Sequence, residues 1–267
     1  MPTPPSHQTG RIDALMEQAS AALVKRHYFE CEQLAAGALR KAHALQDYDR
    51  MARILMPLQE SRRMKRDMAF DANKAFMVTD EIPTGKRLVA GCYLVAPPRV
   101  GVDGRALREH ADQNEVPVIV LVREPTTRDG LWPIVSVGPV TVRTKVMPAP
   151  PAKSSKAPTK KKVAKKAGES DDKGEPPTGG VLPPAVEWFM ETCEALGDAA
   201  ISSVPDSLPA ANRVDMLFER LEALPDHEKL HQRLADACRD ALREPARKRK
   251  PVPDGMFDDE EDGFDDE

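Results

Sequence analysis

Apolar side chains recur every three to four residues along the first part of the chain, from residue 11 to residue 70. This spacing places them on one face of a helix and predicts helices over Arg11–Lys25 and about 27–45. The break between these two helices is short, which predicts that they pack antiparallel as a hairpin. Asp47 fits the N-cap position of a third helix, in which Pro57 is expected to cause a kink or mark a boundary.

The period changes between residues 86 and 147, where continuous apolar runs replace the helical spacing. Runs at 87–96 and 116–122 predict two buried strands, and the segment 103–114 between them predicts a short helix. A strand, a helix and a second strand, with both strands apolar throughout, are typical of a parallel βαβ unit. We expect the N-terminal helices to cover this small module.

The end of this region predicts further strands. Residues 131–146 supply one or two, with a bend at Gly138–Pro139, and Asp129–Gly130 is a hairpin-type turn signal. Thr84-Gly85-Lys86 resembles the end of a phosphate-binding loop, but the earlier glycine and the following Ser or Thr of that motif are missing. We therefore expect a turn before the first strand. The order of the strands in the sheet stays open.

Helical spacing returns after residue 184, at about 187–201, 210–224 and 226–242. The expected fold is therefore α+β: an N-terminal helical hairpin packed with a small α/β module, followed by a linker and an all-α C-terminal domain. Whether the two helical regions touch stays open. The expected division is disordered 1–10, helical 11–70, α/β 71–147, a disordered Lys/Pro-rich linker 148–183, helical 184–244 and a disordered acidic tail 245–267.

The small residues of the first hairpin resemble those of a tetratricopeptide repeat, a helix-turn-helix unit of 34 residues. A similar pattern occurs more weakly at 194–200 and 235–242. The chain departs from the family because it has Cys31 where Ala is usual and no second copy follows. The resemblance implies a hairpin that must pack against something else, and a helical surface that binds partner peptides. The matching positions are Ala19, Ala22, Tyr28, Cys31, Ala35 and Ala38.

The formal net charge of −4 conceals segments of opposite sign. The last fourteen residues hold nine acids, with Phe257 and Phe264 as aromatic anchors for a partner surface. Seven lysines and no acid lie between residues 153 and 168, a composition similar to linker-histone tails, which makes nucleic-acid binding the alternative function. The nucleic-acid candidates are Lys153, Lys156, Lys160, Lys161, Lys162, Lys165 and Lys166.

The sequence also limits the compartment. No run of 18 apolar residues is present, and the first ten residues lack the apolar stretch of a signal peptide. The four cysteines are too scattered for a disulfide framework or a Cys-x-x-Cys zinc site, so we expect small buried hydrophobic residues. These features predict a cytoplasmic protein. The cysteines are Cys31, Cys92, Cys193 and Cys238.

One motif points to metal chemistry. His227-Glu228-Lys229-Leu230-His231 places two histidines one helical turn apart, with Glu228 as a candidate general base, as in zinc metallopeptidases. The charged Lys229, the position directly after Pro225 and the missing third ligand favour a solvated helix start instead. A zinc-dependent hydrolase is therefore the second alternative.

A thiol nucleophile is also conceivable from Cys92 and His110, but Cys92 lies in an apolar strand, where core packing is favoured. We therefore expect a non-enzymatic scaffold or adaptor without a cofactor, which binds partner proteins. Whether it also binds a second copy of itself stays open. The candidate partner-binding residues in the helical region are Tyr28, Arg50 and Arg53. Arg62, Arg63 and Arg66 extend this arginine face, for which pairing with the acidic C-terminal helices is the alternative to simple solvation.

Overall fold

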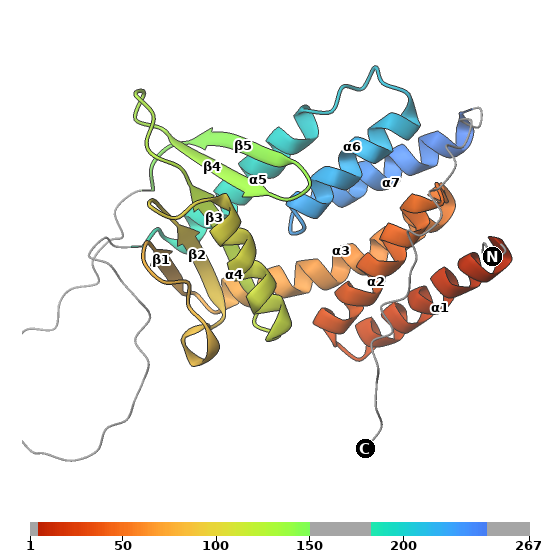
Figure 1. Ribbon diagram of the computed structural model, residues 1–267, viewed down its shortest axis with the longest axis horizontal. Coiled ribbons are helices and arrows are strands. Elements are labelled where there is room, and N and C mark those ends of the chain that lie inside the picture. The colour runs from red at the N-terminus through yellow and green to blue at the C-terminus, as the bar shows by residue number, and fades with distance from the viewer. Residues whose placement is uncertain (1–4, 150–182, 245–267) are drawn as a thin grey trace, which may run out of the picture.

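The computed structural model describes residues 5–149 and 183–244 (Figure 1). The chain begins with the predicted helices, and α1 and α2 form the expected hairpin. Helix α1 starts within the first ten residues, for which the sequence predicts disorder. The three helices are α1 (Pro5–Val24), α2 (Tyr28–Ala44) and α3 (Tyr48–Asp71).

The helix ends follow from local backbone chemistry. Helices α1 and α2 are each followed by a residue in the left-handed region, Arg26 with φ 63° and Gln46 with φ 54°. The next residue then donates its N–H to the carbonyl oxygen of Ala22 or Ala42, at 2.9 Å in both cases. This is the Schellman type of helix end, which satisfies a carbonyl that the helix leaves without a partner. It accounts for the short breaks between the helices.

Helix α3 is a single helix of 24 residues. The prediction for Asp47 is confirmed, because its carboxylate accepts a hydrogen bond from the backbone N–H of Arg50 at 3.1 Å. The helix continues through Pro57, so a boundary at that residue is wrong. At 1.5 Å per residue α3 is about 36 Å long. It is therefore long enough to take part in two different cores.

The sheet contains five strands in the order β1-β2-β3-β4-β5. The first three are parallel, and β4 and β5 add to them in antiparallel directions. Helix α4 (Gly101–Gln113) connects β2 to β3, which confirms the βαβ unit. The strands are β1 (Ala75–Val78), β2 (Gly91–Val95), β3 (Val118–Arg123), β4 (Trp132–Val137) and β5 (Thr141–Val146).

Two details of the sheet differ from the sequence prediction. The apolar run at 87–96 is a strand only in β2, because a 3-10 turn at Gly85–Arg87 comes before it. Strand β1 is missed by the sequence analysis: it has four residues, too few for an alternating pattern to stand out. Pairing with β2 buries three of those four residues.

Helices cover both faces of the sheet. Along β2, Tyr93 and Val95 point toward α4, whereas Cys92 and Leu94 point toward α5 (Val186–Ser202) and the end of α3. Figure 1 shows α4 in front of the sheet and α5 behind it. The expected cover by N-terminal helices is therefore supplied in part by α3, and the C-terminal segment supplies the rest.

The remaining helices, α6 (Ala210–Ala223) and α7 (Glu228–Arg243), pack with α1–α3 around a second core. Ile12, Ile54, Val214 and Leu234 are all fully buried in this helical core. The two helical regions of the sequence thus touch, and the C-terminal helices are divided between the helical core and the sheet core. The fold class is α+β, as predicted. Among the described helices, none has the length and hydropathy needed to cross a bilayer.

Candidate functional site

The sheet opens between β3 and β4, and the turn between α6 and α7 lies at the opening. The backbones of these strands pair at Arg123 with Ile134, the pair nearer the hairpin loop, and at Val122 with Val135. Beyond it, the Ser136 hydroxyl donates a 2.6 Å hydrogen bond to the carbonyl oxygen of Ala223 at the end of α6. The backbone of Gly138 also lies against Ala223. The opening thus joins the sheet to the helical core.

This contact supports a prediction about stability. A Cβ atom at Gly138 would lie 2.7 Å from Cα of Ala223, so Gly138→Ala must push the α6–α7 turn away from the sheet. We expect a loss of about 1–3 kcal/mol in the free energy of unfolding, measured by urea denaturation. Gly37→Ala in α2 is the matched control, because a Cβ atom there meets nothing within 4 Å. The control should gain about 0.5–1 kcal/mol. Equal stabilities of the two variants would contradict the close contact.

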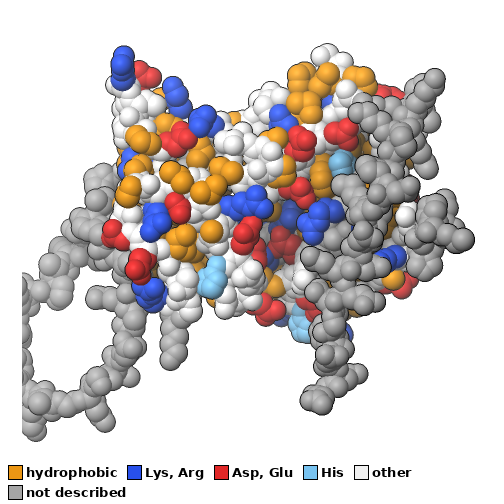
Figure 2. Space-filling model, viewed as in Figure 1, with side chains coloured by type: hydrophobic (Ala, Val, Ile, Leu, Met, Phe, Trp, Pro, Cys, Tyr) orange, Lys and Arg blue, Asp and Glu red, His pale blue; other side chains and the backbone are white. Residues whose placement is uncertain are grey.

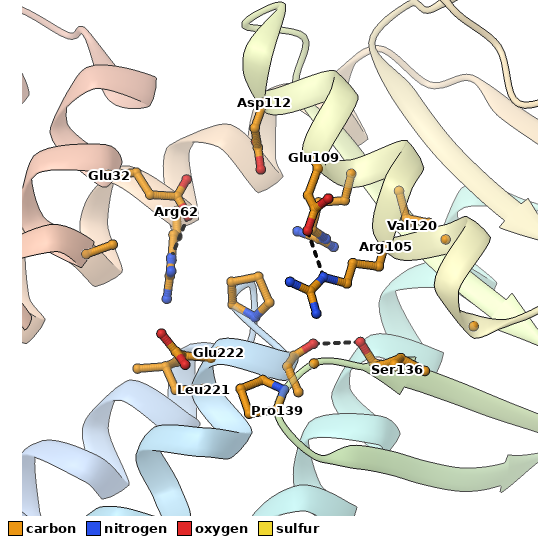
Figure 3. Close-up of a pocket in the computed structure, with 18 of the residues that line it drawn as sticks. Glu32, Arg62, Arg105, Glu109, Asp112, Val120, Ser136, Pro139, Leu221 and Glu222 are labelled. Atoms are coloured by element: carbon orange, nitrogen blue, oxygen red, sulfur yellow. Dashed lines mark hydrogen bonds and ion pairs between the residues drawn. The ribbon is translucent and has the colours of Figure 1, made fainter. Parts of the chain in front are cut away.

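A cavity of about 410 Å³ lies beside this opening, between α2, α4 and α6. We call it the charged cavity. Among the described residues, it is lined by four basic and four acidic side chains over a partly apolar floor. Figure 3 shows Arg105, Glu109 and Asp112 of α4 facing Glu32, Arg62 and Glu222 across the cavity. On the surface, side chains of both signs gather between the sheet and the helices (Figure 2).

The charged groups at the rim are exposed and weakly held. Arg105 and Glu109 form an ion pair of 2.7 Å on α4, with both side chains more than half exposed. Arg40 of α2 reaches across to Glu222 of α6 at 3.7 Å, and its side chain is 61% exposed. Exposed pairs of this kind contribute about 0–1 kcal/mol. The rim charges can therefore exchange these partners for those of a ligand at little cost.

The charged groups at the base form a network that is largely buried at Glu32, Arg62 and Lys65 and exposed at Asp112. Arg62 Nε donates to Glu32 Oε1 at 2.7 Å, and Lys65 joins Glu32 to Asp112 at 2.5 and 2.6 Å. Burial alone raises the pKa of Glu32, but Arg62 and Lys65 outweigh it and lower this pKa to about 2. Glu32 is therefore an anion at neutral pH. The network holds α2, α3 and α4 in register and gives the cavity a fixed base.

The network extends to α7 through His231. Its Nδ1 lies 3.0 Å from the carbonyl oxygen of His227, and its Nε2 lies 3.3 Å from Arg62 Nη1. Because the guanidinium group is only a donor, Nε2 accepts and Nδ1 carries the proton. Burial and Arg62 together lower the pKa of His231 to about 3. This histidine is therefore a neutral structural group at pH 7.

These contacts also bear on the metal hypothesis. Both ring nitrogens of His231 are engaged by protein groups, so His231 has no free lone pair for zinc. Within residues 5–149 and 183–244, no group of three potential ligands is close enough to hold a metal ion. The predicted helix start is also not solvated, since His227 and His231 are 4% and 1% exposed. The interpretation of the motif as a solvated helix start is thus wrong for the histidines, although Glu228 and Lys229 are more exposed.

The hypothesis of a thiol nucleophile at Cys92 fails on geometry. Cys92 points to the α5 side of the sheet, whereas His110 lies on α4 at the other side. Burial raises the pKa of the Cys92 and Cys238 thiols to about 12. Burial also raises the pKa of Cys31 and of Cys193. All four cysteines are free and protonated at neutral pH, as expected for small packing residues.

The predicted partner-binding residues lie outside the charged cavity. Tyr28 is half-buried at the start of α2. Arg50 is occupied within the chain: it forms two 2.8 Å hydrogen bonds with Asp13 of α1 and one of 2.7 Å with Asp47. Arg53 is more exposed, at 3.6 Å from an Asp49 oxygen. Phe257, Phe264 and the seven lysines of 153–166 lie outside the described residues.

The arginine face of α3 is not uniformly solvated. Arg62 is 9% exposed and forms part of the buried network. Arg66 donates to the carbonyl oxygen of Asp226 at 3.4 Å and lies 3.6 Å from Glu228. Both arginines thus contact the C-terminal helices, the alternative that the sequence analysis left open. Arg63 pairs instead with Glu60 and Asp67 on its own helix.

Sequence reasoning missed the cavity residues Arg40, Arg105, Glu109 and Glu222. Each looks like an ordinary charged residue on the polar face of a helix, and only packing brings the three helices together. In the sequence, Gly101 and Gly104 were a signal that helix α4 packs closely on its neighbours. A Cβ atom at either position would lie within 2.3 Å of a valine on the sheet, so the glycines let α4 approach the strands closely.

Comparison of the chain with protein-family models, with curated proteins and with solved structures finds no match. The resemblance of the first hairpin to a tetratricopeptide repeat therefore has no independent support. The site must be interpreted from its own chemistry.

Proposed function

We propose that this protein is a non-enzymatic adaptor that binds a segment of a partner protein in the charged cavity. The observation that carries the proposal is the combination of exchangeable ion pairs at the rim with a fixed network at the base. A binding site needs a rigid frame and groups that can leave their present partners. Arg40 and Arg105 suit acidic side chains of a partner, and Glu109 and Glu222 suit basic ones.

The floor of the cavity favours a peptide over a small polar ion. Leu39, Leu58 and Phe218 contribute apolar surface from the helices, and Val135 and Val137 contribute it from the sheet. An apolar side chain of a partner would lie on this floor with charged neighbours on either side. The adaptor proposal from the sequence is thus retained, but we place the partner between α2, α4 and α6 and not along the face that carries Arg50 and Arg53.

The experiment uses an array of twelve-residue peptides in which one acidic and one basic residue flank a leucine at varied spacing. The variant R105E/E109R exchanges the two charges of the rim pair on α4 and leaves the net charge and the pair intact. The control R239E/D236R does the same for a pair of exposed residues on α7, which are 2.7 Å apart. Neither exchange should alter stability by more than a few tenths of a kcal/mol.

We expect the unaltered protein to bind peptides with charges of both signs, and R105E/E109R to bind them at least tenfold more weakly. That factor corresponds to about 1.4 kcal/mol of lost binding free energy. The control should bind like the unaltered protein. The proposal is wrong if no peptide of the array binds, or if R105E/E109R and the unaltered protein bind the same peptides equally well.

A further inference from the structure

A second cavity lies on the other side of the Arg108–Asp226 ion pair, whose oxygen and nitrogen are 2.5 Å apart. We call it the α5 cavity. It has a volume of about 580 Å³, within the range of small-molecule sites. Its interior is largely apolar and is formed by α3, β3, α5 and the α6–α7 turn. The apolar lining includes Phe70, Leu121, Met190, Leu196 and Leu224.

His227 lines this cavity and makes no hydrogen bond of standard geometry, although its Nε2 lies 3.5 Å from an oxygen of Glu194. The residue is 4% exposed, and neither of its ring nitrogens has a hydrogen-bond partner among the described residues. Buried polar side chains are normally satisfied, so an unsatisfied one needs an explanation. The ring is also held in place, because it packs directly on Gly197 of α5, where a Cβ atom would lie 2.1 Å from it.

The charges of His227 and of its neighbours determine which chemical group of a ligand would bind beside the ring. Burial lowers the pKa of His227, so its ring is neutral at pH 7 and offers one nitrogen lone pair. Its Nε2 lies 3.5 Å from Glu194 and 3.9 Å from Asp198, both on α5. A positively charged group that donates hydrogen bonds would satisfy both carboxylates, and it would also satisfy Nε2 of His227 in the tautomer that carries its proton on Nδ1.

The lining of the α5 cavity as a whole also favours a positively charged ligand. Five carboxylate and two guanidinium groups are among the described residues around the α5 cavity. The chain itself demonstrates the chemistry, because the ammonium group of Lys229 lies 3.2 Å from Glu194 and 3.3 Å from Asp198. The side chain of Lys229 is 55% exposed, so it can be displaced from these carboxylates at little cost.

We propose that the α5 cavity is a binding site for a small amphiphilic amine. The ammonium group lies between His227, Glu194 and Asp198, and the hydrocarbon part extends over Leu121 and Leu196 into the cavity. An anion of the same shape meets the repulsion of the carboxylates. The site is separate from the charged cavity, so it stands whether or not a peptide binds there.

The test compares n-octylamine, n-octanol and octanoate, which share one hydrocarbon chain. At pH 7.5 the amine is a cation, because primary amines have a pKa near 10.4. Binding to the full-length protein is measured by isothermal titration calorimetry. We expect octylamine to bind at least tenfold more tightly than octanol, and octanoate to bind most weakly. The proposal is wrong if octanoate binds as tightly as octylamine. It is also wrong if none of the three binds with a Kd below about 1 mM, which corresponds to a binding free energy of about −4 kcal/mol.

Variants separate this site from nonspecific association with apolar surface. Glu194→Gln should weaken octylamine binding at least tenfold and leave octanol unchanged, since it removes one charge and retains the shape. Lys229→Ala should tighten octylamine binding about threefold, because it frees both carboxylates from an exposed pair. Arg239→Ala on α7 is the control and should have no effect. Circular dichroism verifies that each variant is folded, and equal octylamine affinities of all four proteins would overturn the proposal.

Discussion

Ile54→Ala should lower the free energy of unfolding by about 2–5 kcal/mol, the range for truncating a buried aliphatic side chain. Ile54 is fully buried in the core that α1–α3 share with α6 and α7. Both tryptophans of the chain lie elsewhere, in the core between the sheet and α5, where the ring centroids of Trp132 and Trp188 are 5.8 Å apart. Because α3 and the α6–α7 turn join the two cores, we expect the two cores to unfold together.

The measurement is urea denaturation followed by two signals. Circular dichroism reports all helices, and tryptophan fluorescence reports the sheet core. For Ile54→Ala both signals should shift to the same lower midpoint. Met56→Ala is the control on the same helix: Met56 is 76% exposed, so its truncation should change stability by no more than about 0.5 kcal/mol. A fluorescence transition that stays in place while the dichroism transition shifts would show that the cores are independent domains.

The second large effect is a loss of folding stability at acidic pH. His231 titrates near 6.5 in an unfolded chain and at about 3 in the folded protein. A lowered histidine pKa means that the unfolded state binds the extra proton first, so stability is lost as the pH falls from 6.5 toward 3. At 1.36 kcal/mol for each pKa unit, the total loss is about 4–5 kcal/mol. The groups that face the ring are Arg62, Glu32 and the carbonyl of His227.

His231→Gln replaces the imidazole by a group that does not titrate. Between pH 6 and 4 the free energy of unfolding should fall less steeply in this variant, by about 1.4 kcal/mol per pH unit. His27→Gln is the control, because the side chain of His27 is 59% exposed in the turn before α2. It should keep the acid dependence of the unaltered protein. Equal slopes for His231→Gln and the unaltered protein would mean that His231 does not hold its neutral form in the folded state.

The cavities mark the limit of what could be predicted. Helices, the βαβ unit and the fold class follow from periodicity, because each pattern depends only on neighbours along the chain. The charged residues of the charged cavity come from α2, α3, α4 and α6, and no local pattern connects Arg40 with Glu222. The His227–His231 spacing was visible, yet its chemistry depends on Arg62 and Gly197, which lie far away in the sequence.

The sequence by itself determined the helices and four of the five strands, down to the N-cap at Asp47, but not the short strand β1. Tertiary structure decided how the C-terminal helices are shared, with α5 on the sheet and α6–α7 on the first three helices. The physical reason is that an apolar face specifies burial but not the partner that buries it. The partner is chosen by fit, here by Gly138 against Ala223 and by the pairing of Arg62 with Glu32 and His231.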